Sequence, residues 1–333
     1  SIVYGDALPT LTYSVGGSGL VNGDTLSGVL DTSAAALSSI GDYAVTQGTL
    51  AASSNYAMTY VGGTMTVAPR PITVNANSQS MLYGDAVPAL TYTVGGRGLV
   101  QGDVLSGALA TPATSFSDVN AYAITRGSLA ASSNYTLTYV GSTMTITPAT
   151  LSVTAGSGTM IYGDGLPLLG HSISGWKNGQ NDALFSGVSV SSSVTSASNV
   201  GTYTTTASGG SLSGAASGNY KLAYVDGTMT VTPATLTVTA GNRSMVYGDG
   251  RPSLSYGVSG WKNGQTADLL SDVTVRTSAG STSSVGAYSI NAAGGTLSGA
   301  ASGNYSLIYV DGSLSVAPRP ITVTANAATM VYG

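Results

Sequence analysis

The chain repeats one set of short motifs four times, and this repetition limits its possible folds more than any other feature. The tripeptide Tyr-Gly-Asp begins at Tyr4, Tyr83, Tyr162 and Tyr247, so successive copies are 79, 79 and 85 residues apart. An Asn-Tyr pair and a proline recur with the same rhythm, with tyrosines at Tyr56, Tyr135, Tyr220 and Tyr305. A period of about 80 residues is that of a whole domain, not of a solenoid repeat of about 20–45 residues. Each copy is therefore expected to have its own core.

The recurring prolines, which are Pro69, Pro148, Pro233 and Pro318, give the expected domain boundaries. They divide the chain into 1–68 (first strand missing), 69–147 (short class), 148–232 and 233–317 (long class), and 318–333, which starts a further repeat. The long class differs from the short class by small insertions spread over several turns. Loops tolerate such insertions and strands do not, so we expect one scaffold throughout.

The local patterns predict strands and turns. Charged residues make up only 7% of the chain and glutamate is absent, while Thr, Val, Ser, Gly and Tyr dominate. That composition favours strands over helices. We therefore expect an all-β fold, a tandem array of immunoglobulin-like β-sandwich domains that forms an elongated rod.

The phrase "NYTLTYVGSTMTITPATLSV" from Asn134 and its three counterparts predict a hairpin followed by a joint. Two alternating strands flank Gly141-Ser142, with Gly-Gly or Asp-Gly in the other copies, which is a strong hairpin signal. The proline that follows cannot donate to a strand ladder and fixes its own φ. We expect the proline to end one domain and to connect it directly to the first strand of the next, so that the two domains have little freedom to move against each other.

Two further motifs have expected structural roles. A tyrosine at the start of a strand suggests a tyrosine corner, whose hydroxyl binds nearby backbone, at Tyr43, Tyr122, Tyr203 and Tyr288. Tyr83-Gly84-Asp85 and its counterparts are expected to form a turn, with Gly in an unusual φ, Asp capping backbone amides and Tyr covering the core edge. A calcium site at a joint, through Asp24 or Asp103, remains the alternative.

The order of these motifs strongly resembles that of MBG repeats of the YGX type, which are immunoglobulin-like modules found mostly in bacteria. The resemblance covers the whole chain. It implies a stalk in a very large secreted or surface-bound adhesin of a Gram-negative bacterium. The structural motif is taken to comprise Tyr83, Gly84, Asp85, Tyr122, Tyr135, Tyr162, Tyr203, Tyr247 and Tyr288.

Several function classes are disfavoured by the residues. His171 is the only histidine and stands where other copies have tyrosine, and there is no cysteine, so we expect no enzyme, no cofactor and no metal site. A net charge of −4 argues against a nucleic-acid partner, and no apolar run is long enough to enter a membrane.

Three functions are compared. The preferred one is an extracellular structural segment of an adhesin or biofilm-matrix protein whose partners are neighbouring repeats or other copies of itself. The alternative is a carbohydrate-binding array that holds polysaccharide through Trp176 and Trp261 of the "SGWKNGQ" segments. Against that alternative, these tryptophans are expected to pack on their own or the adjacent domain. The third class, an enzyme, is set aside for the reasons above.

Overall fold

The fold is all-β in a computed structural model that describes residues 1–299 and 302–333. The helical elements that it describes are three short 3-10 turns, η1 (Asp182–Leu184), η2 (Gly214–Ala216) and η3 (Ala267–Leu269). The chain forms two compact units, of which the first comprises Ser1–Thr150, Trp176–Leu184 and Leu212–Lys221. The second comprises Leu151–Gly175, Phe185–Ser211 and Leu222–Gly333.

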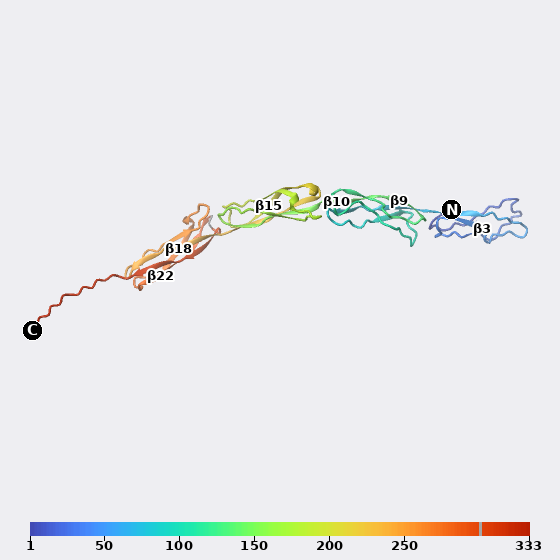
Figure 1. Cartoon of the computed structure of the whole chain (residues 1–333). Helices are drawn as coiled ribbons and strands as arrows, with labels where there is room; N and C mark the ends of the chain where they lie inside the picture. Colours follow the sequence, from blue (N-terminus) through green and yellow to red (C-terminus); the bar gives the residue numbers. More distant parts are fainter. Residues whose placement is uncertain (300–301) are drawn as a thin grey trace. The chain divides into compact units, whose positions relative to one another are not determined.

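The second repeat, in which Figure 1 labels β9 and β10, has two sheets, both within the first unit. The first sheet has the order β7-β5-β9, from β7 (Tyr92–Gly96), β5 (Arg70–Ala76) and β9 (Tyr135–Val140). The second has the order β6-β10-β8, from β6 (Gln79–Leu82), β10 (Ser142–Thr147) and β8 (Ala121–Ile124). The opening strand β5 lies parallel to β9 and antiparallel to β7.

The fourth repeat, in the second unit, has the same plan with a longer second sheet. The first sheet is β20-β18-β23, from β20 (Tyr256–Ser259), β18 (Ala234–Ala240) and β23 (Tyr305–Val310). The second is β19-β24-β22-β21, from β19 (Arg243–Val246), β24 (Gly312–Ala317), β22 (Gly286–Leu297) and β21 (Leu270–Thr277). Inward side chains of both sheets, including Val238, Ile290 and Leu314, form one core.

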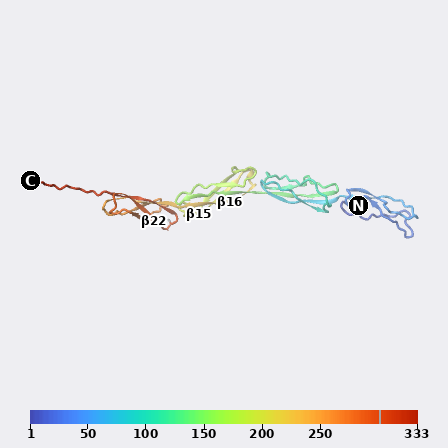
Figure 2. The same cartoon turned by 90° about the horizontal axis from the view of Figure 1, so that it is seen from below.

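The third repeat repeats this pattern, and its strands β15 and β16 are labelled in Figure 2. One sheet has the order β13-β11-β16, from β13 (His171–Ser174), β11 (Ala149–Ala155) and β16 (Tyr220–Val225). The other has the order β12-β17-β15-β14, from β12 (Gly158–Ile161), β17 (Gly227–Thr232), β15 (Gly201–Leu212) and β14 (Phe185–Ser192).

The first repeat has only one sheet among the described residues. Its order is β1-β4-β3-β2, from β1 (Ile2–Val3), β4 (Gly63–Ala68), β3 (Gly41–Thr46) and β2 (Asp31–Thr32). Residues 56–61, which correspond to β9, form no strand.

The predicted hairpin is wrong. β9 pairs with β5 in one sheet, whereas β10 pairs with β6 and β8 in the other, so the chain crosses between sheets at Gly141. Alternation of inward and outward side chains is the same in a hairpin and in such a crossing, so the pattern alone does not distinguish them. The Tyr139 hydroxyl binds the Ile124 carbonyl oxygen at 2.8 Å and thereby links the two sheets.

Candidate functional site: the joints between repeats

We use the term joint for the region where the Tyr-Gly-Asp turn of one repeat meets the Asn-Tyr pair and adjacent loop of the next. Joints 1 and 2 lie within the first unit and contain Tyr4 and Tyr83, and joint 3 lies within the second unit and contains Tyr162. At each of them, one proline separates the last strand of one repeat from the first strand of the next.

The residue after the proline is already hydrogen-bonded into the next repeat. Its amide donates to the carbonyl oxygen of the asparagine of the Asn-Tyr pair at 2.9–3.0 Å, in the pairs Arg70–Asn134, Ala149–Asn219 and Ala234–Asn304. No free linker therefore separates the two repeats at these positions.

Two buried tyrosines meet edge to face at every joint. The pairs are Tyr4–Tyr135, Tyr83–Tyr220 and Tyr162–Tyr305, with ring centroids 5.4–5.6 Å apart and interplanar angles of 78–80°. All six rings are less than a tenth exposed. Such aromatic pairs stabilise a contact by about 0.5–1.5 kcal/mol beyond the effect of burial alone.

Around these tyrosines the hydrophobic core continues from one repeat into the next. At joint 3, Met229 and Val231 of the third repeat share one cluster with Leu236 and Tyr305 of the fourth. At joint 1, Met65 and Val67 of the first repeat share one cluster with Ile72 of the second. Swinging one repeat against the other would expose this apolar surface to water, which costs free energy in proportion to area.

The asparagine side chain adds directional bonds across each joint. Its Oδ1 accepts from a backbone amide just before the tyrosine corner of the preceding repeat, at 2.8–3.1 Å, in the pairs Ile40–Asn134, Val119–Asn219 and Val200–Asn304. Asn219 and Asn304 are only 2% exposed. Removing a buried partner leaves an unsatisfied group, so these bonds fix the orientation of the repeats.

The expected amide-capping role of Asp85 and its counterparts is wrong, because these carboxylates accept hydrogen bonds from cationic side chains instead. Asp85 binds Lys177 and Asp164 binds Lys262, both at 2.8 Å, and each lysine belongs to the next repeat. At joint 1, Asp6 binds Arg97 at 2.9 Å and Arg70 at 3.4 Å. These groups are partly exposed, so the ion pairs set orientation more than they add stability.

The glycine of the Tyr-Gly-Asp turn allows the next repeat to approach closely. Gly5, Gly84 and Gly163 have φ of +84°, +83° and +87°. A Cβ atom placed on Gly84 would lie 2.4 Å from the Cβ of Lys177, and one on Gly163 would lie 2.3 Å from that of Lys262. The unusual φ was expected, whereas the close approach was not.

Each joint tyrosine of the Asn-Tyr pair also donates its hydroxyl proton within its own repeat. Tyr135 binds Asp103 at 2.5 Å, and Tyr220 and Tyr305 bind Gln180 and Gln265 at 2.6 Å. Burial raises the pKa of all three tyrosines above the usual value near 10. Asp103 is thus engaged by tyrosine, and among the described residues no three His or Asp side chains gather as metal ligands.

Both tryptophans pack onto the joint tyrosines. Trp176 lies edge to face with Tyr220, and Trp261 with Tyr305, each with centroids 5.3 Å apart. Both are half-buried. Trp176 Nε1 donates to Asp182 at 2.7 Å, whereas the buried Nε1 of Trp261 has no partner. This geometry favours the packing interpretation over an open sugar-stacking platform.

The remaining motif residues lie at the ends of strands. The hydroxyls of Tyr43, Tyr122, Tyr203 and Tyr288 donate at 2.8–3.0 Å to the carbonyl oxygen four residues earlier, which is the bond that a tyrosine corner requires. Tyr247 is 45% exposed, unlike its counterparts Tyr4, Tyr83 and Tyr162, which are buried. His171 lies exposed on β13, paired with Ala155 of β11.

The comparisons with known proteins agree with the repeat pattern. The profile of a family described as "MBG domain (YGX type)" matches residues 1–66, 72–145, 151–230 and 236–315. No match to the chain is found among curated proteins.

Proposed function

Because the chain belongs to the MBG (YGX-type) domain family, we propose that it is a structural spacer built from repeats whose joints resist bending. Repetition supplies length, and the joints supply stiffness. The observation that supports this proposal best is the core that continues across joints 1 and 3, from Met65 to Ile72 and from Met229 to Leu236. A flexible tether would have no need to bury apolar side chains at its linkers.

The proposed setting is the cell surface or exterior of a Gram-negative bacterium, in a large adhesin or biofilm-matrix protein. The resemblance of the motif order to such proteins supports this setting. A surface of hydroxyls with few charges and no cysteine is compatible with export. No helix within residues 1–299 and 302–333 has the length and apolar character needed to cross a bilayer.

If the array is a spacer, its function should depend on its length and stiffness more than on which side chains its surface carries. The test replaces this array in the native full-length protein by an unrelated rigid array of equal length, and in parallel by a Gly/Ser-rich segment with the same number of residues. Attachment of the cells to a surface should survive the first replacement and fall with the second. Loss of attachment with both replacements would contradict a spacer and point to a ligand held by the repeats.

Sugar binding through Trp176 and Trp261 is the competing outcome of that test. Each indole already packs edge to face with a joint tyrosine, which supports a structural role for it. A glycan array probed with the wild-type chain and with the Trp176→Ala, Trp261→Ala double variant separates the two functions. Under our proposal neither protein retains a glycan.

A further inference from the structure

In the fourth repeat, the strand β23 lies at the edge of its sheet. It pairs with β18 in the parallel register that sets Ile308 beside Thr237, and it is the last strand of the order β20-β18-β23. In the second and third repeats, β9 and β16 lie at the sheet edge in the same way, so the open edge belongs to the plan of the repeat. An edge strand presents a row of backbone N–H and C=O groups to any further strand.

The outward face of β23 is apolar. Leu307 packs against the core, so the alternation of side chains turns Ile308 and Val310 outward. These two side chains are 48% and 44% exposed, and Tyr309 between them is 40% exposed. The Tyr309 hydroxyl donates to the Gly294 carbonyl oxygen, which holds the ring at the edge of the sheet. Single exposed apolar residues are common, whereas a contiguous exposed patch marks an interaction site.

The corresponding strands of the second and third repeats lack this patch. The counterpart of Ile308 is Thr138 in β9 and Ala223 in β16. At the position of Ser306, β16 has Lys221, and lysine on an edge strand discourages pairing with another sheet. Each of the three strands ends in an exposed valine. The isoleucine is therefore what distinguishes β23.

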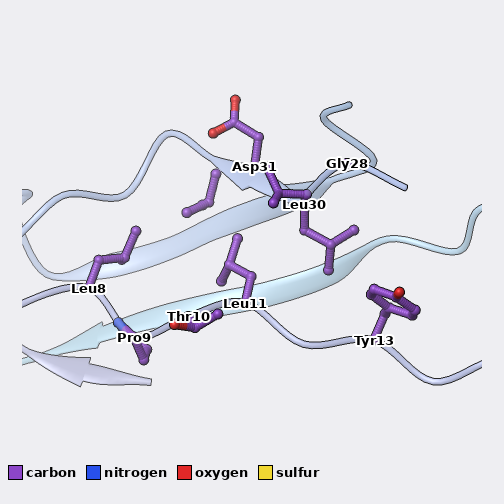
Figure 3. A pocket seen from close by; sticks show the side chains of 10 residues that line it. Leu8, Pro9, Thr10, Leu11, Tyr13, Gly28, Leu30 and Asp31 are labelled. Atoms are coloured by element: carbon purple, nitrogen blue, oxygen red, sulfur yellow. The ribbon is translucent and has the colours of Figure 1, made fainter. Parts of the chain in front are cut away.

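Other edge strands carry charges or short polar side chains. In the fourth repeat, β21 has Asp272 and Arg276, both exposed. In the first repeat, β2 has Asp31, and Figure 3 shows its carboxylate directed away from Leu11 and Leu30. In the third repeat, β14 is uncharged, but its exposed side chains are serines. Because like charges that face each other across two strands oppose pairing, the absence of charge in β23 permits it to pair with an identical strand.

We propose that two copies of the chain pair side by side through β23, with the strands antiparallel about a two-fold axis at Ile308. Ile308 of one copy then faces Ile308 of the other, and Ser306 faces Val310. Backbone hydrogen bonds and cross-strand apolar contacts both stabilise such a pair. The residue that follows the strand, Asp311, lies about 20 Å from its own copy in this register, so the two carboxylates do not repel each other strongly.

The contact uses the same surface on both copies, so it closes at a dimer. Because the two strands run in opposite directions, the contact joins two arrays. This inference deepens the proposed function, on which it rests, by naming a second copy as the partner that a spacer of this kind links. The outward residues of β23 make none of the joint contacts described above. Failure of the pairing would therefore leave the stiffness of the joints untouched.

Sedimentation velocity over a wide concentration range tests the association. The weight-average mass of the wild-type chain should rise twofold with concentration. Ser306→Lys with Ile308→Ala gives β23 the sequence of β16 (Tyr220–Val225), which the same fold accommodates, and should weaken dimerisation at least tenfold. Thr235→Lys with Thr237→Ala is the matched control, because it makes the same changes on the neighbouring strand β18, and it should still dimerise. A monomeric wild-type chain, or equal association of both variants, overturns the proposal.

The converse change tests whether these two side chains are sufficient. Lys221→Ser with Ala223→Ile gives β16 the sequence of β23. The chain then has two pairing strands, and its mass should rise beyond that of a dimer. A mass that stays at the dimer contradicts the assignment of the pairing to these positions.

A disulfide tests the register, since the chain has no cysteine of its own. Ser306→Cys with Val310→Cys places the two cysteines opposite each other across the two-fold axis, within the Cα separation that a disulfide needs. Oxidation should give a covalent dimer. Ser306→Cys alone should give at least tenfold less, because this residue lies about 13 Å along the strands from its own copy. Equal yields, or no covalent dimer from the double variant, overturn the inference.

Discussion

The ring of Tyr305 meets the ring of Tyr162 edge to face, with centroids 5.4 Å apart and an interplanar angle of 80°. The two tyrosines belong to adjacent repeats, and each is buried. Several motif residues that define each repeat in the sequence therefore make their contacts between repeats. The repeat pattern thus encodes the joint as well as the sandwich.

Replacement of Tyr305 tests this contribution. Tyr305→Ala should lower the local opening free energy of β18 by about 3 kcal/mol, because a buried aromatic ring is lost from a core shared by two repeats. Native-state hydrogen exchange measures the change. Tyr56→Ala is the matched control, because the Tyr56 ring meets no other aromatic ring among the described residues. Equal losses near the two sites would contradict the account of joint 3.

The close approach at the Tyr-Gly-Asp turn is tested by two glycines with the same backbone geometry. Gly163 and Gly248 have φ of +87° and +88°, but only Gly163 has a lysine Cβ from a following repeat beside it. Gly163→Ala should destabilise by about 1–3 kcal/mol more than Gly248→Ala, because overpacking adds to the shared backbone strain. Scanning calorimetry of both variants measures the difference. If the two melting curves coincide, the close approach of Lys262 to Gly163 contributes nothing to the cost of the substitution.

The unpaired Nε1 of Trp261 predicts a stabilising substitution. Asp182, which pairs with Trp176, corresponds to Ala267 in the fourth repeat. Ala267→Asp should supply the missing acceptor and raise the unfolding free energy by about 1 kcal/mol. Ala183→Asp adds the same charge one position away from Asp182, in a repeat whose tryptophan is already paired, and should give no gain. Thermal melts of the two variants decide this, and a gain from both would mean that charge alone is responsible.

Stability should fall at high pH. Burial raises the pKa of Tyr135, Tyr220 and Tyr305. A raised folded-state pKa means that the folded chain holds these protons more tightly, so the stabilisation is fully present below about pH 10 and is lost as pH rises through the folded pKa. Melting temperatures between about pH 8 and about pH 11.5, recorded with tyrosinate absorbance, measure the effect. Tyr305→Phe should have a weaker pH dependence, and an unchanged dependence would contradict this origin.

The sequence could predict the parts of the fold that are local. The strand before each proline, the strand after it, and the bond from Tyr122 to a carbonyl four residues earlier involve neighbours in the chain. The crossing at Gly141 could not be predicted, because the partner of β9 is β5, some sixty residues earlier. An Asp-Gly or Gly-Gly turn looks the same in either arrangement.

The ion pairs at the joints could have been found from the sequence. Arg70 and Arg319 follow their prolines, whereas Pro148 and Pro233 are followed by alanine, and the two repeats that these prolines open carry Lys177 and Lys262 instead. Each Tyr-Gly-Asp turn therefore has a cation at its joint, either the arginine after the proline or the lysine of the long repeats, and at joint 1 Arg97 adds a second. The motif reading of the sequence did not predict this alternation.

Small-angle X-ray scattering tests the central claim most directly, namely that the repeats are joined too firmly to swing. If each repeat is about 30–40 Å long, firmly joined repeats predict a maximum dimension of about 120–160 Å and a radius of gyration near 40 Å. A radius of gyration near 20 Å, as for a compact globule of this length, or a broad distribution of dimensions, as for hinged repeats, would contradict the account.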